Sequence, residues 1–333
     1  MLQDETYLIQ QINEWRNGLF FLMATGQERK ALDAIKQGVD PNSISQPSYI
    51  DIADFLIPDD RLFSHLEFEP LEISIILRNQ RLFSALLEHG ADPLSHPIIK
   101  SVHKRTKSAA ERCAQFGFTA GLKTLNEHGF KLWPYLDEPI ESLLFESISE
   151  HGSAECFNYL YDEIGRPDIN FSTKDMPGYA DGLTFLDSSH RYAPLEIVEA
   201  ILKKGANINK EKDVKKRKLL ISEEFKEEAG SSFMAHQALS DYYDTLPLIY
   251  ASYHGQIERV TLYLKYGADP TLRDSNGNTA LDAVKDPRRP SDIKSHLHIG
   301  LKKIESLLNT AIEEKLGKGV AMYTAAKPDL DIE

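Results

Sequence analysis

The chain has 333 residues, of which 41% are hydrophobic and 27% charged, a balance typical of a soluble folded protein. Its 51 acidic residues outnumber its 38 lysines and arginines and give a formal net charge of -13 at pH 7. Such a surface repels phosphate backbones, which argues against nucleic acid as a partner. No apolar run has the length of a membrane span, and the two cysteines lack zinc-site or disulfide-framework spacing. We therefore expect a soluble, cytoplasmic monomer without membrane insertion, metal or cofactor.

The first segment, residues 1–16, places apolar residues such as Leu8, Ile12 and Trp15 on one face of a helix. Acidic Asp4 and Glu5 stand where a secretory signal would carry basic residues. This segment is predicted to be an amphipathic capping helix and not a secretion signal.

Next, glycines recur at a fixed distance along the chain. Gly26 and Gly38 are separated by the same distance as Gly117 and Gly129, and Gly255 and Gly267 repeat it. Apolar residues between them recur at helical spacing, as in Ile257, Val260, Leu262 and Leu264. Each glycine-bounded segment is therefore predicted to be a helix that buries one stripe and ends at its closing glycine.

Short turns follow the closing glycines, as in Gly90-Ala91-Asp92-Pro93 and Gly267-Ala268-Asp269-Pro270. Asp favours turn geometry, and proline prevents the helix from resuming. A shorter apolar segment with proline near its start precedes the longer helix, as in Leu246-Pro247-Leu248-Ile249. The chain is thus predicted to consist of helix pairs.

The stretch Thr184-Phe185-Leu186-Asp187, then Leu195-Glu196-Ile197-Val198, then Gly205-Ala206-Asn207-Ile208-Asn209 resembles the ankyrin repeat almost residue by residue. The resemblance implies an all-α solenoid, non-enzymatic, that recognises proteins through its concave face. We expect at most one or two short hairpins, and Asn276-Gly277 is the predicted turn of one. Six units are expected, with a seventh, degraded one starting at Thr279: 17–45, 68–95, 108–133, 143–171, 184–209 and 246–277.

The spacing departs from the family's regular repeat because two long finger insertions interrupt the array of residues 17–286. We place these insertions at about 43–67 and 210–245. Behind the array, residues 287–316 are predicted to form a C-terminal helical cap, and 317–333 a flexible tail.

Several side chains invite chemical interpretations, each with a plainer alternative. Cys113 takes the place of an inward alanine and is expected to be buried, whereas Cys156 and His151 could form a catalytic pair but lack an oxyanion motif. Histidines before glycines, such as His89 and His128, are expected to cap helices, with metal binding as the alternative. The basic run Lys215-Lys216-Arg217-Lys218 reads either as a targeting signal or as part of a solvated helix.

The resemblance also implies which residues at the ends of the first helices point out of the groove. We expect a partner protein to bind through this groove and the two finger insertions, although Phe116 and Leu77 could instead pack beneath the insertions. Low-fidelity repeats with large insertions look like ankyrin effectors that intracellular bacteria deliver into host cells. Alternatives are a toxin-neutralising protein of the bacterial cytosol and an enzyme whose site lies in an insertion. The candidate binding residues are Leu77, Phe116, His151, Arg191, Tyr192, Tyr253 and His254.

Overall fold

The computed structural model describes 18–42, 69–94, 108–132, 141–172, 183–211, 246–287 and 291–325, with side chains left out for a few of these. It divides into two compact units, Met1–Pro167 and Asp168–Glu333, which we call unit 1 and unit 2. The predicted N-terminal cap, the basic run at 215–218, and nearly all of both insertions lie outside the described residues.

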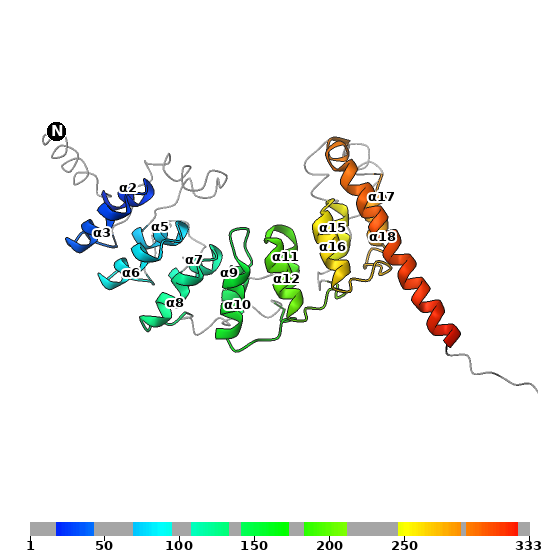
Figure 1. Cartoon of the computed structure of the whole chain (residues 1–333), viewed down its shortest axis with the longest axis horizontal. Helices are drawn as coiled ribbons and strands as arrows, with labels where there is room; N and C mark the ends of the chain where they lie inside the picture. Colours follow the sequence, from blue (N-terminus) through cyan, green and yellow to red (C-terminus); the bar gives the residue numbers. More distant parts are fainter. Residues whose placement is uncertain are drawn as a thin grey trace, which may run out of the picture. The chain divides into compact units, whose positions relative to one another are not determined.

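Unit 1 contains four consecutive helix pairs (Figure 1). Each first helix has seven residues, and the first three of them each contact the first helix of the next pair. The second helices, of nine or ten residues, form a second row beside them. The pairs are α2 (Gly18–Ala24) with α3 (Glu28–Lys36), α5 (Pro70–Ile76) with α6 (Gln80–Glu88), α7 (Ala109–Gln115) with α8 (Thr119–Glu127), and α9 (Glu141–Ser147) with α10 (Ala154–Glu163).

Unit 2 contains the fifth pair, α11 (Phe185–Tyr192) and α12 (Leu195–Lys203), and the sixth, α15 (Pro247–Tyr253) and α16 (Ile257–Lys265). Helix α11 contacts α15 and α12 contacts α16, so the two pairs stack directly although 212–245 separates them in sequence. The seventh repeat is reduced to the single helix α17 (Ala280–Lys285), which packs on α15. The last helix, α18 (Ser291–Ala325), covers α16 and α17 and continues beyond Leu316 into the segment predicted to be a flexible tail.

The helix ends follow from local chemistry that the sequence displays. The closing glycines all adopt the left-handed conformation that a β-carbon disfavours, with φ between 77° at Gly129 and 91° at Gly205. At the N-terminal ends of α7, α11 and α17, a Ser or Thr and an acidic residue three positions later bond each other's backbone N–H groups. The predicted helix pairs are confirmed, and these glycines and capping residues explain where the helices begin and end.

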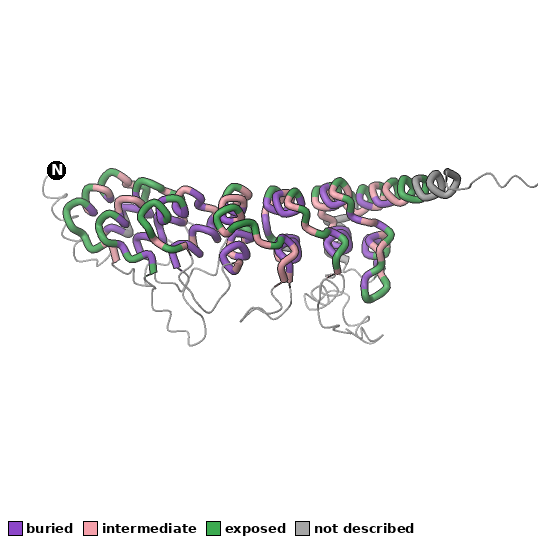
Figure 2. The backbone as a smooth tube through the Cα atoms, turned by 90° about the horizontal axis from the view of Figure 1, so that it is seen from below, coloured by how far each residue is buried: buried purple, intermediate pink, exposed green. Residues whose placement is uncertain are grey.

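The core lies between the two rows of helices (Figure 2). In α16, Val260 is fully buried and Leu262 is 8% exposed, whereas Leu264 is half-buried. Tyr263, which the apolar pattern did not single out, is fully buried as well. The predicted apolar stripe therefore does face the core, and Tyr263 is its largest buried side chain.

Asparagine side chains connect the turns of successive pairs. In unit 1, Asn42 donates its amide to the Gly90 carbonyl (3.1 Å) and accepts from the Asp92 N–H (2.9 Å). In unit 2, Asn209 makes the same two bonds with Gly267 (3.0 Å) and Asp269 (2.8 Å). We call each such pair of hydrogen bonds from one asparagine side chain an asparagine bracket. Each bracket satisfies a backbone carbonyl and a backbone N–H that would otherwise depend on water.

β-structure in the described part of the chain amounts to one isolated bridge between Ser172 and Thr184, which confirms the all-α prediction. The expected turn at Asn276-Gly277 is present, since the Gly277 N–H donates to the Asp274 carbonyl (2.9 Å). The Asp274 carboxylate accepts from the N–H groups of Asn276 and Asn278. Its oxygens serve the turn, as expected for a structural loop.

Candidate functional site

The predicted binding residues lie where first helices end, a region that we call the tips. Their exposure differs widely: Tyr192 is 68% exposed and Leu77 37%, whereas Phe116 and Tyr253 are 4% and 1% exposed. His151 and His254 are half-buried. Arg191 lies in α11, but its side chain is outside the described part of the chain.

Phe116 is 4% exposed and is not the exposed aromatic that the sequence predicted. The imidazole of His151 stacks on its ring, with centroids 5.6 Å apart and planes at 10°. His151 reaches it because α9 is followed by a longer turn, whose Ser149 and Ser153 donate to the Gln115 and Gly117 carbonyls. The fourth tip therefore closes over the third.

The expectation that Tyr253 is exposed is wrong, because α15 is the central helix of unit 2. It contacts α11, α16 and α17, and every residue from Pro247 to Tyr253 is buried. The His254 ring lies 4.2 Å from the ring of Tyr250 and 5.1 Å from that of Tyr253. Tyr253 and much of His254 thus belong to an aromatic cluster of the core.

The tip of α11 is closed by an arginine from the next pair. This helix ends at Ala193-Pro194, without the glycine that usually ends the helices of this chain. Arg259 of α16 donates to the carbonyls of Ser189 (3.3 Å) and Ala193. These bonds satisfy carbonyls that the helix end leaves open, and they leave Tyr192 as the exposed residue of the tip.

Both thiols are buried, and their electrostatics fit structural residues. Burial raises the pKa of Cys113 well above its ordinary value, and burial also raises the pKa of Cys156 to about 12. A thiol with such a pKa is protonated at neutral pH and is a poor nucleophile. The possible Cys156–His151 pair therefore lacks an activated thiolate.

The capping role expected of the histidines holds for two of them. His89 and His128 place Nδ1 at 2.8 Å and 2.9 Å from the Ala85 and Thr124 carbonyls of their own helices. In the described ranges, no three His, Cys, Asp or Glu side chains gather in a way that could hold a metal ion. A membrane-crossing helix is also absent from that part, where none is both long and apolar enough.

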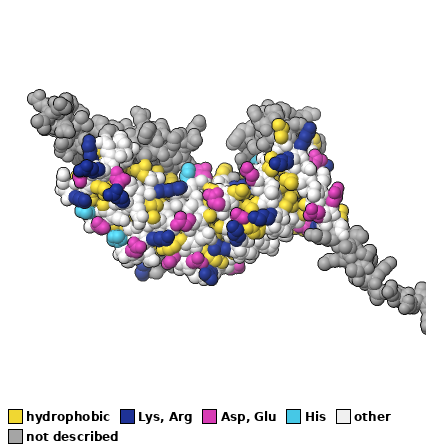
Figure 3. Space-filling view, viewed as in Figure 1, with side chains coloured by type: hydrophobic (Ala, Val, Ile, Leu, Met, Phe, Trp, Pro, Cys, Tyr) yellow, Lys and Arg dark blue, Asp and Glu magenta, His cyan; other side chains and the backbone are white. Residues whose placement is uncertain are grey.

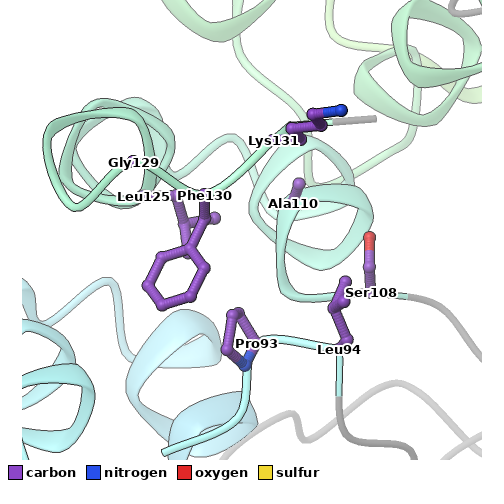
Figure 4. Close-up of a pocket in the computed structure, with 8 residues that line it drawn as sticks. All are labelled: Pro93, Leu94, Ser108, Ala110, Leu125, Gly129, Phe130 and Lys131. Atoms are coloured by element: carbon purple, nitrogen blue, oxygen red, sulfur yellow. The ribbon is translucent and has the colours of Figure 1, made fainter. Parts of the chain in front are cut away.

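One pocket of about 200 Å³ opens in unit 1 between the end of α6 and the pair α7–α8. The ring of Phe130 points toward Pro93 across it, and the Lys131 ammonium points away (Figure 4). Among the described residues that line it there is no His, Cys or carboxylate, the groups that a catalytic site would bring together. Its lining residues are Pro93, Leu94, Ser108, Ala110, Leu125, Gly129, Phe130 and Lys131.

On the face shown in Figure 3, basic and acidic side chains are interspersed, with hydrophobic groups between them. Several described charges are paired, including Arg81 with Glu28 (3.1 Å) and Lys265 with Glu199 (3.1 Å). The lysine and tyrosine that bond Glu199 lower the pKa of that carboxyl. The acidic residues on this face are thus mixed with basic ones and do not form a continuous negative patch.

Known proteins were compared with the chain at the levels of sequence and structure. No protein-family model matches the sequence, and no curated protein matches it. The human ASB11 ankyrin repeat domain is similar in structure, with 20% identity, a TM-score of 0.48, and coverage of 85% of this chain and 96% of that one. The ankyrin repeat domain of Bcl-3 gives 17%, 0.41, 83% and 97%.

The geometry within the pairs decides the fold. A capped short helix, a tight turn, a longer helix, a left-handed glycine and a bracketing asparagine recur in the order that the resemblance predicts. Each unit has the fold of stacked ankyrin repeats. The predicted family resemblance is therefore confirmed as to fold, and any partner has to be argued from the tips.

Sequence reasoning missed two arginines of these ankyrin repeats, Arg78 and Arg259. For Arg78 a signal was present, because it occupies the turn position where Gly26, Gly117 and Gly255 stand in other repeats. For Arg259 the signal was indirect, namely the lack of a glycine after α11. Neither signal identifies the group that the guanidinium reaches.

Proposed function

We propose that the chain is a protein–protein interaction scaffold that binds a partner protein through the exposed tips of its ankyrin repeats. The observation that carries this proposal is the exposure of Tyr192, at 68%, on a tip that Arg259 otherwise closes. A folded helix end that presents most of a large aromatic ring to solvent offers a surface that a partner can contact. Tyrosine is among the residues that contribute most to protein interfaces.

Leu77 supports the same reading in unit 1. It follows α5 directly, as His254 follows α15, and it is 37% exposed. Single exposed apolar residues are common on protein surfaces, so position matters more than exposure here. Leu77 in unit 1 and Tyr192 in unit 2 each stand eight positions after the N-cap residue of their first helix, Glu69 and Thr184, so both tips present a large side chain at the same place in the repeat.

The test replaces Tyr192 by alanine and measures capture of a partner by the full chain. Proteins that bind the immobilised parent are identified by mass spectrometry, and their capture by each variant is then quantified. Leu316→Ala is the matched control, because Leu316 is 61% exposed but lies on α18. We expect Tyr192→Ala to weaken capture by about 2 kcal/mol, or roughly thirtyfold, with an unchanged melting temperature. Equal capture by both variants would move the site elsewhere.

The narrower hypotheses differ in the source of the partner. A bacterial effector would bind a protein of the host cell, whereas a toxin-neutralising protein would bind one from the bacterium itself. Parallel captures from a host lysate and from a bacterial lysate, each with Tyr192→Ala as the negative control, distinguish the two. The insertions proposed for a cryptic enzyme lie outside the described residues.

A further inference from the structure

The turn between α5 and α6 carries an arginine in a conformation that favours glycine. Gly26, Gly117 and Gly255 have φ of 72°, 61° and 67° at the corresponding turns, and Arg78 has φ of 51°. A β-carbon makes this left-handed region unfavourable, so glycine would fit the turn with less strain. The arginine side chain is therefore the feature that needs an explanation.

The side chain of Arg78 is held in place by a distant repeat. Its Nη2 donates to the His151 carbonyl, 2.9 Å away, in the turn that follows α9 two pairs further along. His151 in turn stacks on Phe116 of the intervening pair. The guanidinium is thus anchored across the tips of three consecutive repeats of unit 1.

The other donors of this guanidinium have no partner among the described residues. Arginine has five N–H groups, and in the described part of the chain Arg78 is exposed and pairs with no carboxylate. Three other arginines of unit 1 pair with carboxylates: Arg81 with Glu28 (3.1 Å), Arg112 with Glu72 (2.8 Å) and Arg166 with Asp162 (3.0 Å). Arg29 of α3 is exposed and pairs with no described carboxylate, but unlike Arg78 it bonds no other repeat in the described part of the chain.

The acidic residue closest in sequence to the anchoring carbonyl is Glu150, whose carboxylate lies 3.5 Å from Nε2 of His151. An exposed arginine that is anchored by a backbone carbonyl and pairs with no described carboxylate stands out in a chain with 51 acidic and 38 basic residues.

We propose that Arg78 binds a carboxylate of the partner protein, with the adjacent Leu77 contacting an apolar side chain next to that carboxylate. This rests on the proposed function and specifies the partner of unit 1 as a peptide segment with an acidic residue beside an apolar one. A guanidinium binds a carboxylate through two parallel hydrogen bonds, and one that is already anchored loses less freedom on binding.

The experiment selects peptides from a random display library on the immobilised full chain and measures their affinities in solution. Arg78→Gly is the test variant, because glycine fits the left-handed turn and the fold is retained. Arg166→Gly is the matched control: it has φ of 60°, lies in the same unit and changes the charge equally, but Arg166 is bonded to Asp162.

We expect the selected peptides to share an Asp or Glu beside an apolar residue. Arg78→Gly should bind them at least about tenfold more weakly, Arg166→Gly should bind them like the parent, and Asp→Asn or Glu→Gln peptides should lose the same factor. Unfolding curves recorded in parallel verify that both variants are folded.

Three results would overturn the inference: selected peptides without acidic residues, equal binding by Arg78→Gly and the parent, or equal losses in the two arginine variants. Peptides that depend on Tyr192 and not on Arg78 would refute this inference and leave the proposed function intact. Selection of no peptide would contradict the inference, and the partner capture with Tyr192→Ala would then test the proposed function by itself.

Discussion

Each unit uses an arginine at the tip of another repeat, but the two arginines are engaged to different extents. In unit 2, the half-buried Arg259 donates to two carbonyls near the end of α11. In unit 1, the exposed Arg78 donates a single bond to the His151 carbonyl. Arg259 is therefore part of the folded core, and Arg78 keeps donors for a ligand.

The cause of the difference lies in the backbone that each arginine meets. The turn after α9 bonds itself, since the N–H groups of Ile148 and Gly152 donate to the carbonyls of Phe145 and Ser149. The end of α11 passes into extended backbone at Ala193 and leaves carbonyls for a side chain. An arginine contributes most to folding where the backbone leaves acceptors unpaired.

A third arginine extends the comparison, and its loss has the largest expected effect. Arg112 and Glu72 form an ion pair at 2.8 Å with side chains only 15% and 10% exposed. Arg112→Met leaves a buried carboxylate unpaired and should lower the free energy of unfolding by about 3 kcal/mol in urea titrations.

Adding Glu72→Leu to Arg112→Met removes the stranded charge, so the double variant should recover most of the lost stability. A double variant as unstable as Arg112→Met would attribute the loss to packing of the arginine stem and not to charge.

Arg259→Met should have the next largest effect. Methionine keeps the apolar stem but removes the donors to Ser189 and Ala193, and we expect a loss of about 2 kcal/mol. Hydrogen exchange should show faster exchange in α11 and α15. Lys203→Ala, which removes an exposed pair with Glu199, should change little and serves as the control. Unchanged exchange in Arg259→Met would mean that the α11 end closes without it.

The asparagine brackets test whether the units are alike where their chemistry is the same. Asn42→Ala and Asn209→Ala each remove a pair of bonds of matching geometry, and each should lower the free energy of unfolding by about 1 kcal/mol. Clearly unequal losses in chemical denaturation would show that identical brackets contribute differently in the two units.

The smallest effect concerns pH. Burial raises the pKa of Glu72 from its ordinary value of 4.5, and Arg112 offsets only part of that rise. Since the folded-state pKa is the higher one, the stabilisation from proton binding is complete below 4.5 and is lost as pH rises through the folded-state pKa. Relative to Glu72→Gln, the parent should therefore lose stability between acidic and neutral pH. A difference that does not vary with pH would contradict the raised pKa.

Much of the fold could be predicted from the sequence because its signals are local. Closing glycines, Thr-x-x-Asp caps and Asp-Pro turns each depend on a few neighbouring residues. The extra residue of α10 is visible in the sequence as well, because Gly152 and Gly165 are one position further apart than the other glycine pairs. Helix α18 is a partial exception, because it continues to Ala325 through a segment whose glycines suggested a tail.

The tips could be located from the sequence, but their exposure could not. Helical periodicity tells which residues share a face, whereas exposure depends on what the neighbouring repeat lays over them. Phe116 is covered by His151 from a longer turn, and Tyr253 by helices packed on both sides of α15. Tyr192 stays exposed because Arg259 bonds the carbonyls at the end of α11 and does not cover the tyrosine ring.

The most direct test of the account compares Arg78→Gly and Arg259→Met in the same two assays, urea unfolding and binding of the selected acidic peptides. Arg78→Gly should stay within about 0.5 kcal/mol of the parent's free energy of unfolding and lose peptide binding at least about tenfold, while Arg259→Met should lose about 2 kcal/mol of stability. If Arg78→Gly is destabilised as much as Arg259→Met and still binds the peptides, the assignment of one arginine to binding and the other to folding is contradicted.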